Sequence, residues 1–182
     1  MIISSTSFLI ILCALLFGIT MKIADLLNEH GLKWFRGSAI IFGLLWGIFG
    51  ALLVLSDNAI ANIVLAMNLA FIIRGRLDYL NHQAAASAIV ITFLFGATFN
   101  PLLFLAFYTI FLIFGSLRDY IGDKLKVKTG VLAIYDQIMW YYPIPTLIYC
   151  LLCGNWIIFG AFLTFTVGYD TTKFIYKKKG YY

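Results

Sequence analysis

The chain has 182 residues, of which 63% are hydrophobic, 18% aromatic and only 12% charged. Soluble domains carry about 25% charged and about 45–50% apolar residues, so this composition excludes a water-soluble globular protein, and its hydrophobicity excludes a disordered one. The net charge of +5 could indicate a nucleic-acid-binding protein, but in so apolar a chain basic residues are expected at the cytoplasmic ends of membrane spans. We therefore expect membrane lipids, and no nucleic acid, as partners.

The apolar segments predict an all-helical, multi-pass membrane protein with one transmembrane domain over residues 1–182. A helix needs about 20 apolar residues to cross a bilayer core. The run 84–114 is too long for one span and contains Asn100-Pro101, a turn signal, so it is divided into two helices. The predicted spans are 3–21, 38–55, 59–73, 84–99, 101–116, 131–153 and 156–170, with a basic tail at 171–182.

The positions of the basic residues support seven spans. All 13 lie in the connections after the first, third and fifth spans or in the tail. Because positive charge marks cytoplasmic segments, the N-terminus is expected outside the cell and the C-terminus inside, with the protein in the cell membrane. These residues are Lys22, Lys33, Arg36, Arg74, Arg76, Arg118, Lys124, Lys126, Lys128, Lys173, Lys177, Lys178 and Lys179.

An aspartate recurs at the cytoplasmic end of each inward-going helix, at Asp25, Asp78, Asp119 and Asp170. The second and third copies match best, GRLDYLNH against SLRDYIGD, so we interpret the chain as repeated helical hairpins plus a closing helix. The helix dipole disfavours an anion at a helix C-terminus. Ion pairing at the interface and a shared polar site are the two explanations for this pattern.

A shared site predicts an enzyme at the cytoplasmic membrane face. Carboxylates bind Mg²⁺, and arginines bind phosphate oxygens. We therefore expect a small membrane enzyme that acts on a lipid or isoprenoid phosphate or diphosphate, with Mg²⁺ stabilising the leaving group. The predicted catalytic residues are Asp78, Asp119 and Asp123. The predicted metal ligands are these three residues and Asp25. The predicted substrate-binding residues are Arg74, Arg76, Arg118, Asn81 and Asn68.

The pair Asp119 and Asp123 shares a helix face if the helix continues through Gly122. The two histidines, His30 and His82, are either interfacial polar side chains or groups that bind a metal or move protons.

Asp136 and Gln137 are inside the membrane edge if the sixth helix begins near Gly130, and on a wet interfacial segment otherwise. Pro143 and Pro145 are expected to kink the helix just beyond.

Small residues give the second predicted helix one smooth face, at Gly43 and Gly47. This face predicts close packing, either within the chain or in a homo-oligomer. Cys150 and Cys153 form a CxxC pattern inside a predicted span without further ligands, so a packing role is expected for both.

Two other functions remain open. A transporter or channel would use Asn68 and Asp136 to line a path, and it predicts a polar route to Asp57 and Asn100 on the outer side. A non-catalytic membrane subunit predicts scattered, solvent-facing aspartates. An enzyme predicts a closed outer side and a polar site that opens toward the cytoplasm.

Overall fold

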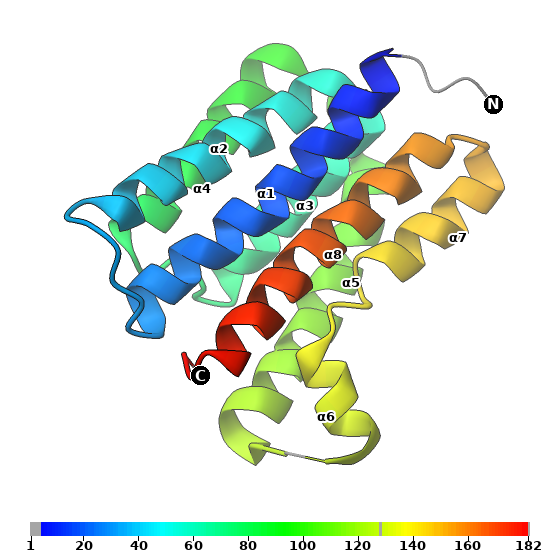
Figure 1. The fold of residues 1–182 in the computed structure, drawn as a ribbon. Coiled ribbons are helices and arrows are strands. Elements are labelled where there is room, and N and C mark those ends of the chain that lie inside the picture. The colour runs from blue at the N-terminus through cyan, green and yellow to red at the C-terminus, as the bar shows by residue number, and fades with distance from the viewer. Residues whose placement is uncertain (1–4, 128, 182) are drawn as a thin grey trace.

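The computed structural model describes residues 5–127 and 129–181, and this part of the chain contains helices and no strands (Figure 1). Parts of three predicted features lie outside the described residues, namely the start of the span 3–21, Lys128 and the end of the tail. The helices are α1 (Ser5–Glu29), α2 (Ser38–Ser56), α3 (Asn58–Ile73), α4 (Leu80–Gly96), α5 (Pro101–Asp119), the π-helix η1 (Tyr120–Leu125), α6 (Gly130–Gln137), α7 (Pro143–Cys153) and α8 (Trp156–Lys178).

Three stretches of the described chain are long and apolar enough to cross a membrane, namely Thr6–Glu29, Ser38–Ser56 and Pro101–Leu125. Three further apolar helices, α3, α4 and α7, are shorter. The turn predicted at Asn100-Pro101 is confirmed, since α4 ends at Gly96 and α5 begins at Pro101. The Asn100 side chain accepts a hydrogen bond from the Leu103 amide at 3.2 Å and so caps α5.

The predicted single helix at 131–153 is wrong, because the structure breaks it into α6 and α7. Proline has no amide proton, and its ring collides with the carbonyl four residues earlier in a continuous helix. Pro143 is therefore the first residue of a new helix, and Ile138 is extended. In Figure 1, α6 lies apart from the main bundle, close to the end of α5.

Glycines set the closest helix contacts. A Cβ atom on Gly18 of α1 would lie 2.2 Å from the Phe165 carbonyl oxygen of α8, so these two backbones touch. A Cβ atom on Gly43 of α2 would lie 2.6 Å from the Asn81 side chain of α4, and one on Gly47 would lie 3.0 Å from the α4 backbone. The glycine face predicted for a homo-oligomer is therefore occupied within the chain, and a second copy would need another surface.

Hydrogen bonds between short polar side chains tie together the loops at the end of the bundle predicted to lie outside the cell. Asn62, which is fully buried, donates to the Thr98 carbonyl at 2.9 Å and accepts from the Asn100 amide at 2.8 Å. Asn155 donates to Asp57 at 3.2 Å, and Asp57 also caps the first turn of α3. The α2–α3, α4–α5 and α7–α8 connections are thus joined directly.

Candidate functional site

Charged side chains gather at the opposite end of the bundle, where α1 and α5 end and where the α3–α4 loop and the second half of α8 lie (Figure 1). They form three groups. The histidine cluster contains Lys22, Asp25, Asn28, Glu29, Asn81, His82 and Tyr169. The arginine cluster contains Arg74, Arg76, Asp119 and Asp123, and the lysine cluster contains Arg118, Asp136, Asp170 and Lys173.

The histidine cluster brings together three metal-ligand side chains. Asp25 and Glu29 are four residues apart, so they share one face of α1. His82, in the first turn of α4, is 1% exposed and faces them. One ligand atom from each of these residues lies within 4.8 Å of the others. Two carboxylates and one imidazole at this spacing are able to hold a divalent cation.

Contacts from α1 and α8 fix the Asp25 carboxylate. Its Oδ2 atom accepts a hydrogen bond from the Tyr169 hydroxyl at 2.9 Å and from the Lys22 ammonium group at 3.3 Å. Its Oδ1 atom lies 3.7 Å from His82 Nε2. One oxygen is therefore held by the protein, and the other faces the imidazole.

The His82 ring is held between two aromatic side chains, since Trp46 and Tyr79 both meet it edge-to-face with centroids 5.4 and 5.3 Å away. The Asn28 amide nitrogen lies 3.0 Å from His82 Nε2 and donates to Asn81 Oδ1, also at 3.0 Å. An amide N–H that donates to Nε2 assigns the lone pair to that nitrogen. The Asn28 amide N–H occupies the only lone pair of Nε2, so a cation bound to His82 would take the place of this hydrogen bond.

The other ring nitrogen, Nδ1, is buried without a hydrogen-bond partner among the described residues. The Asp78 carboxylate lies 3.8 Å from it. Metal-binding histidines commonly direct this second nitrogen toward a carboxylate, which orients the ring. Asp78 therefore lies behind the imidazole and faces away from the Asp25 side of the cluster.

The arginine cluster joins groups for which the sequence predicted separate roles. Asp119 accepts from Arg74 Nε at 2.9 Å and lies 2.7 Å from Arg76, which also binds Asp123. The π-helix continues α5, so Asp119 and Asp123 share Arg76 as a partner. Gly115 makes room for Arg74, because a Cβ atom there would lie 2.2 Å from its guanidinium group. Asp119 and Asp123, two of the predicted metal ligands, and Arg74 and Arg76, two of the predicted phosphate-binding arginines, thus neutralise one another.

The prediction that an aspartate ends each inward-going helix is wrong at two positions. α3 ends at Ile73, so Asp78 lies in the following loop, two residues before α4. At that position an anion faces a helix N-terminus, which the helix dipole favours. Asp170 lies within α8, which continues to Lys178. The connections that follow α1, α3 and α5 also differ from one another, since the third continues as the π-helix.

The lysine cluster attaches the α6–α7 connection to its neighbours. Asp170 accepts from the Met139 amide at 3.1 Å, and Arg118 donates to the Asp136 carbonyl at 2.9 Å. Lys173 lies 3.4 Å from the same carbonyl. Asp136 itself is half-buried, on a short helix outside the longer bundle helices. These contacts fix the position of the α6–α7 connection. The Arg118 guanidinium group is bound to a backbone carbonyl there.

We expect the stability of the protein to increase above neutral pH because of Lys173. Burial, and then the nearby Arg118, lowers the pKa of Lys173 from 10.5 to about 8. Between these two values the unfolded chain binds more protons than the folded chain, so the free energy of unfolding increases with pH, by about 1 kcal/mol between about pH 7.5 and about pH 9. Thermal unfolding at both pH values measures this increase.

In the variant Lys173→Met, the free energy of unfolding should no longer increase by about 1 kcal/mol between about pH 7.5 and about pH 9. Lys177, on the same helix but exposed, provides the control, and Lys177→Met should behave as the unaltered protein does. An unchanged pH dependence in Lys173→Met would contradict this assignment.

The remaining predicted substrate-binding residues make contacts between helices. Asn68 is buried in α3 and donates to the Ala86 carbonyl of α4 at 2.9 Å. Asn81 donates to the Ala39 carbonyl of α2 at 2.8 Å and belongs to the histidine cluster. His30 lies beyond the end of α1, where burial, and then the charge of Lys22, lowers its pKa.

Sequence reasoning missed the contributions of Asn28 and Tyr169 to the site. Lys22, Asp25 and Glu29 are spaced three and four residues apart, which is a sequence signal for one helical face. Tyr169 carries no such signal, because only the contact between α1 and α8 brings it to Asp25.

No protein-family model, no curated protein and no solved structure matches this chain.

Proposed function

We propose that this protein is a multi-pass membrane enzyme that acts on a lipid or isoprenoid phosphate at the cytoplasmic face, assisted by a divalent cation. In this proposal the chain crosses the membrane seven times, through the apolar parts of α1 to α5, the segment 138–153 that contains α7, and the apolar part of α8. The N-terminus lies outside, and α6 and the charged ends of α1 and α8 lie at the cytoplasmic interface. α7 alone, with 11 residues, is too short to cross. Exposed apolar side chains support the membrane location. On α2 they form one stripe, at Ile40, Leu44, Ile48, Leu52 and Leu55. A stripe of this kind on a folded protein needs an apolar solvent.

The observation that carries the proposal is the convergence of Asp25, Glu29 and His82 beside the basic end of the bundle. A cation bound there would neutralise phosphate oxygens and stabilise a leaving group. The carboxylates suit Mg²⁺, while the imidazole suits Mn²⁺ or Zn²⁺ as well. In this proposal Asp25 keeps its predicted role as a ligand. Asp78 orients the imidazole, and Asp119 and Asp123 hold the end of α5.

Transport is the less favoured function. The hydrogen-bonded loops around Asn62 and Asp57 close the opposite end of the bundle, and the Asn68 amide is bonded to the neighbouring helix. A purely structural subunit is also less favoured, because Asp25 and Asp170 are held by specific partners.

Cation binding tests the proposal directly. Mn²⁺ titrated into the detergent-purified protein, followed by electron paramagnetic resonance, should show one bound ion. We expect His82→Ala and Glu29→Gln each to weaken Mn²⁺ affinity by about tenfold or more, since each removes one of three ligands. Asp123→Asn is the matched control, because that carboxylate is exposed and binds Arg76. Its Mn²⁺ affinity should match that of the unaltered protein.

The same variants then test catalysis. With an isoprenoid diphosphate as substrate, release of phosphate or diphosphate should require Mn²⁺ or Mg²⁺ and should decrease in His82→Ala but not in Asp123→Asn. Absence of Mn²⁺ binding, or equal binding by His82→Ala, would refute the cation site and with it the proposed enzyme.

A further inference from the structure

Three buried polar groups near the end of α3 and the α6–α7 connection have no hydrogen-bond partner among the described residues. They are Nη1 of Arg74 and the hydroxyl groups of Tyr141 and Tyr142. The Arg74 side chain is 5% exposed, Tyr141 is 4% exposed and Tyr142 is completely buried. Buried polar groups normally have partners, so these three indicate a missing ligand if they lie together.

One face of α5 brings them together. Phe111, Gly115 and Arg118 are spaced four and three residues apart, so they lie on the same side of this helix. The Tyr142 ring packs against Phe111, with centroids 4.9 Å apart. Nη1 of Arg74 lies against Gly115, where a Cβ atom would come within 2.2 Å of it. Arg74 and Tyr142 therefore contact α5 one helical turn apart.

Arg118 and Tyr141 belong to the same group. Nε of Arg118 donates to the Asp136 carbonyl at 2.9 Å, which holds the guanidinium group beside the α6–α7 connection. The rings of Tyr141 and Tyr142 lie 4.3 Å apart between their centroids. Both tyrosines are close enough to Arg74 and to Arg118 for their hydroxyl groups to interact with the two positive charges.

The unpaired groups are hydrogen-bond donors. A guanidinium group has five N–H donors and no acceptor. Arg74 binds Asp119 through Nε and Nη2, which leaves both protons of Nη1 unused. Each tyrosine hydroxyl has one further proton to donate. Several donors beside two positive charges suit an anion with several oxygens, and phosphate is the anion that arginine commonly binds in proteins.

Helix α8 connects this group to the candidate cation site. Tyr169 donates to the Asp25 carboxylate of the histidine cluster. The next residue, Asp170, accepts from the amide of Met139, two residues before Tyr141. Adjacent residues of one helix thus contact both sites.

We propose that this group binds the phosphate of the lipid substrate, through Arg74, Arg118, Tyr141 and Tyr142. The two guanidinium groups neutralise the phosphate oxygens, and the two hydroxyl groups donate hydrogen bonds to them. The inference rests on the proposed function, since it names the residues that hold the phosphate of that substrate. It keeps two of the arginines predicted from the sequence and adds two tyrosines.

Binding of farnesyl diphosphate to the full-length protein in detergent, without divalent cations, tests the proposal by native mass spectrometry. We expect tighter binding than for farnesol, which has the same chain without phosphate. Tyr142→Phe should weaken farnesyl diphosphate binding by about tenfold or more, because it removes a hydrogen bond to a charged group and little else. Tyr149→Phe is the matched control, since Tyr149 packs against Phe107 in the same contact between α5 and α7. It should change the affinity by less than about threefold.

Unfolding of the lipid-free protein separates ligand binding from a structural role. The Tyr142 hydroxyl has no partner among the described residues, so Tyr142→Phe should leave the unfolding temperature unchanged or raise it. A lower unfolding temperature together with unchanged binding of farnesyl diphosphate would show that the hydroxyl binds a structural water, and would overturn the proposal.

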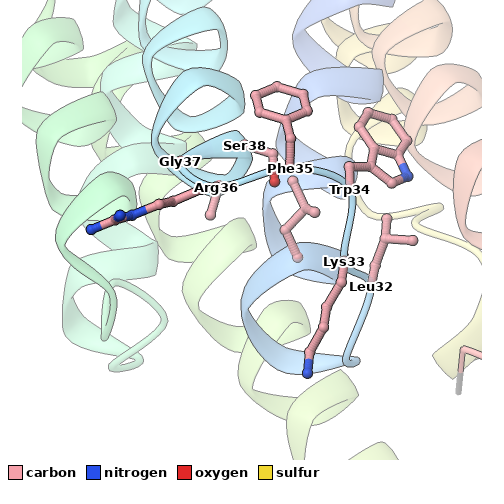
Figure 2. A pocket seen from close by; sticks show the side chains of 9 residues that line it. Leu32, Lys33, Trp34, Phe35, Arg36, Gly37 and Ser38 are labelled. Atoms are coloured by element: carbon pink, nitrogen blue, oxygen red, sulfur yellow. The ribbon is translucent and has the colours of Figure 1, made fainter.

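Two arginine variants test for a general effect of charge. Arg118→Gln should weaken farnesyl diphosphate binding by about tenfold or more. Arg36→Gln removes the same charge from the exposed loop between α1 and α2, where Arg36 and Lys33 extend in different directions (Figure 2). It should change the affinity by less than about threefold. Equal losses in the two variants would overturn the site, and equal affinity for pyrophosphate and farnesyl diphosphate would overturn the assignment to a lipid.

The outcome is independent of the cation test. If the protein binds no Mn²⁺ but loses farnesyl diphosphate in Tyr142→Phe, the phosphate site stands and the proposed enzyme fails. If Mn²⁺ binds as expected and farnesyl diphosphate binding is unchanged in Tyr142→Phe and Arg118→Gln, the phosphate site is wrong and the cation site stands.

Discussion

Replacement of Arg74 by alanine should lower the free energy of unfolding by about 3 kcal/mol, because it leaves a half-buried carboxylate without its buried partner. The Arg74 side chain is 5% exposed and lies 2.7 Å from Asp119 through Nη2, in addition to its hydrogen bond through Nε. The pair joins the end of α3 to the end of α5. Thermal and chemical unfolding in detergent micelles, followed by tryptophan fluorescence, measure the loss.

The control for this effect is Arg76→Ala. Arg76 binds the same carboxylate but is 38% exposed, so water screens the pair and the expected loss is about 1 kcal/mol or less. The double variant Arg74→Ala/Asp119→Asn should be more stable than the sum of the two single variants predicts, because the two groups are coupled. Equal losses for Arg74→Ala and Arg76→Ala would contradict the assignment of Arg74 as the buried partner.

Gly18→Ala should lower the free energy of unfolding by about 2 kcal/mol, although alanine is the better helix former. The added methyl group would lie 2.2 Å from the Phe165 carbonyl oxygen, and backbone atoms cannot move aside as a flexible side chain can. α1 and α8 must therefore separate. Because the Tyr169 hydroxyl reaches Asp25 only across this contact, Mn²⁺ affinity should decrease together with the unfolding temperature.

Gly160→Ala provides the same substitution at a second glycine of the contact between α1 and α8. There the methyl group would approach the terminal carbon of Ile11 at 2.8 Å, and this flexible side chain is able to turn away. We expect its stability to be unchanged or increased by up to about 1 kcal/mol from the gain in helix propensity. If both variants lost equal stability, the close backbone contact at Gly18 would not be the cause.

The sequence predicted the helical architecture well where the signal was local. The turn at Asn100-Pro101 was predictable because proline both ends one helix and starts the next. The helix at 131–153 was wrongly drawn as continuous, since Pro143 was expected to kink the helix and instead separates α6 from α7. Hydropathy alone does not distinguish an apolar span from two shorter apolar helices.

The candidate site was predictable only in part. One-sided charge predicted that the charged side chains gather at one end of the bundle, because basic residues and most acidic residues share the same connections. The pairing within that end was not predictable. Asp119 and Asp123 were expected beside Asp25, and they instead bind Arg74 and Arg76. The pairing depends on which helices pack together, and α3 packs against α5 while α1 packs against α2 and α8.

By itself, the sequence determined the helical class, the long apolar segments and the end of the molecule where charge collects, since these follow from composition and from residues close together in the chain. Only the tertiary structure decided that His82 of α4 faces Asp25 and Glu29 of α1, and that Arg74 and Tyr142 contact the same face of α5. Such neighbours are set by close contacts between helices, at Gly18 and Gly43 above all, and their geometry depends on side-chain volume rather than on any local pattern.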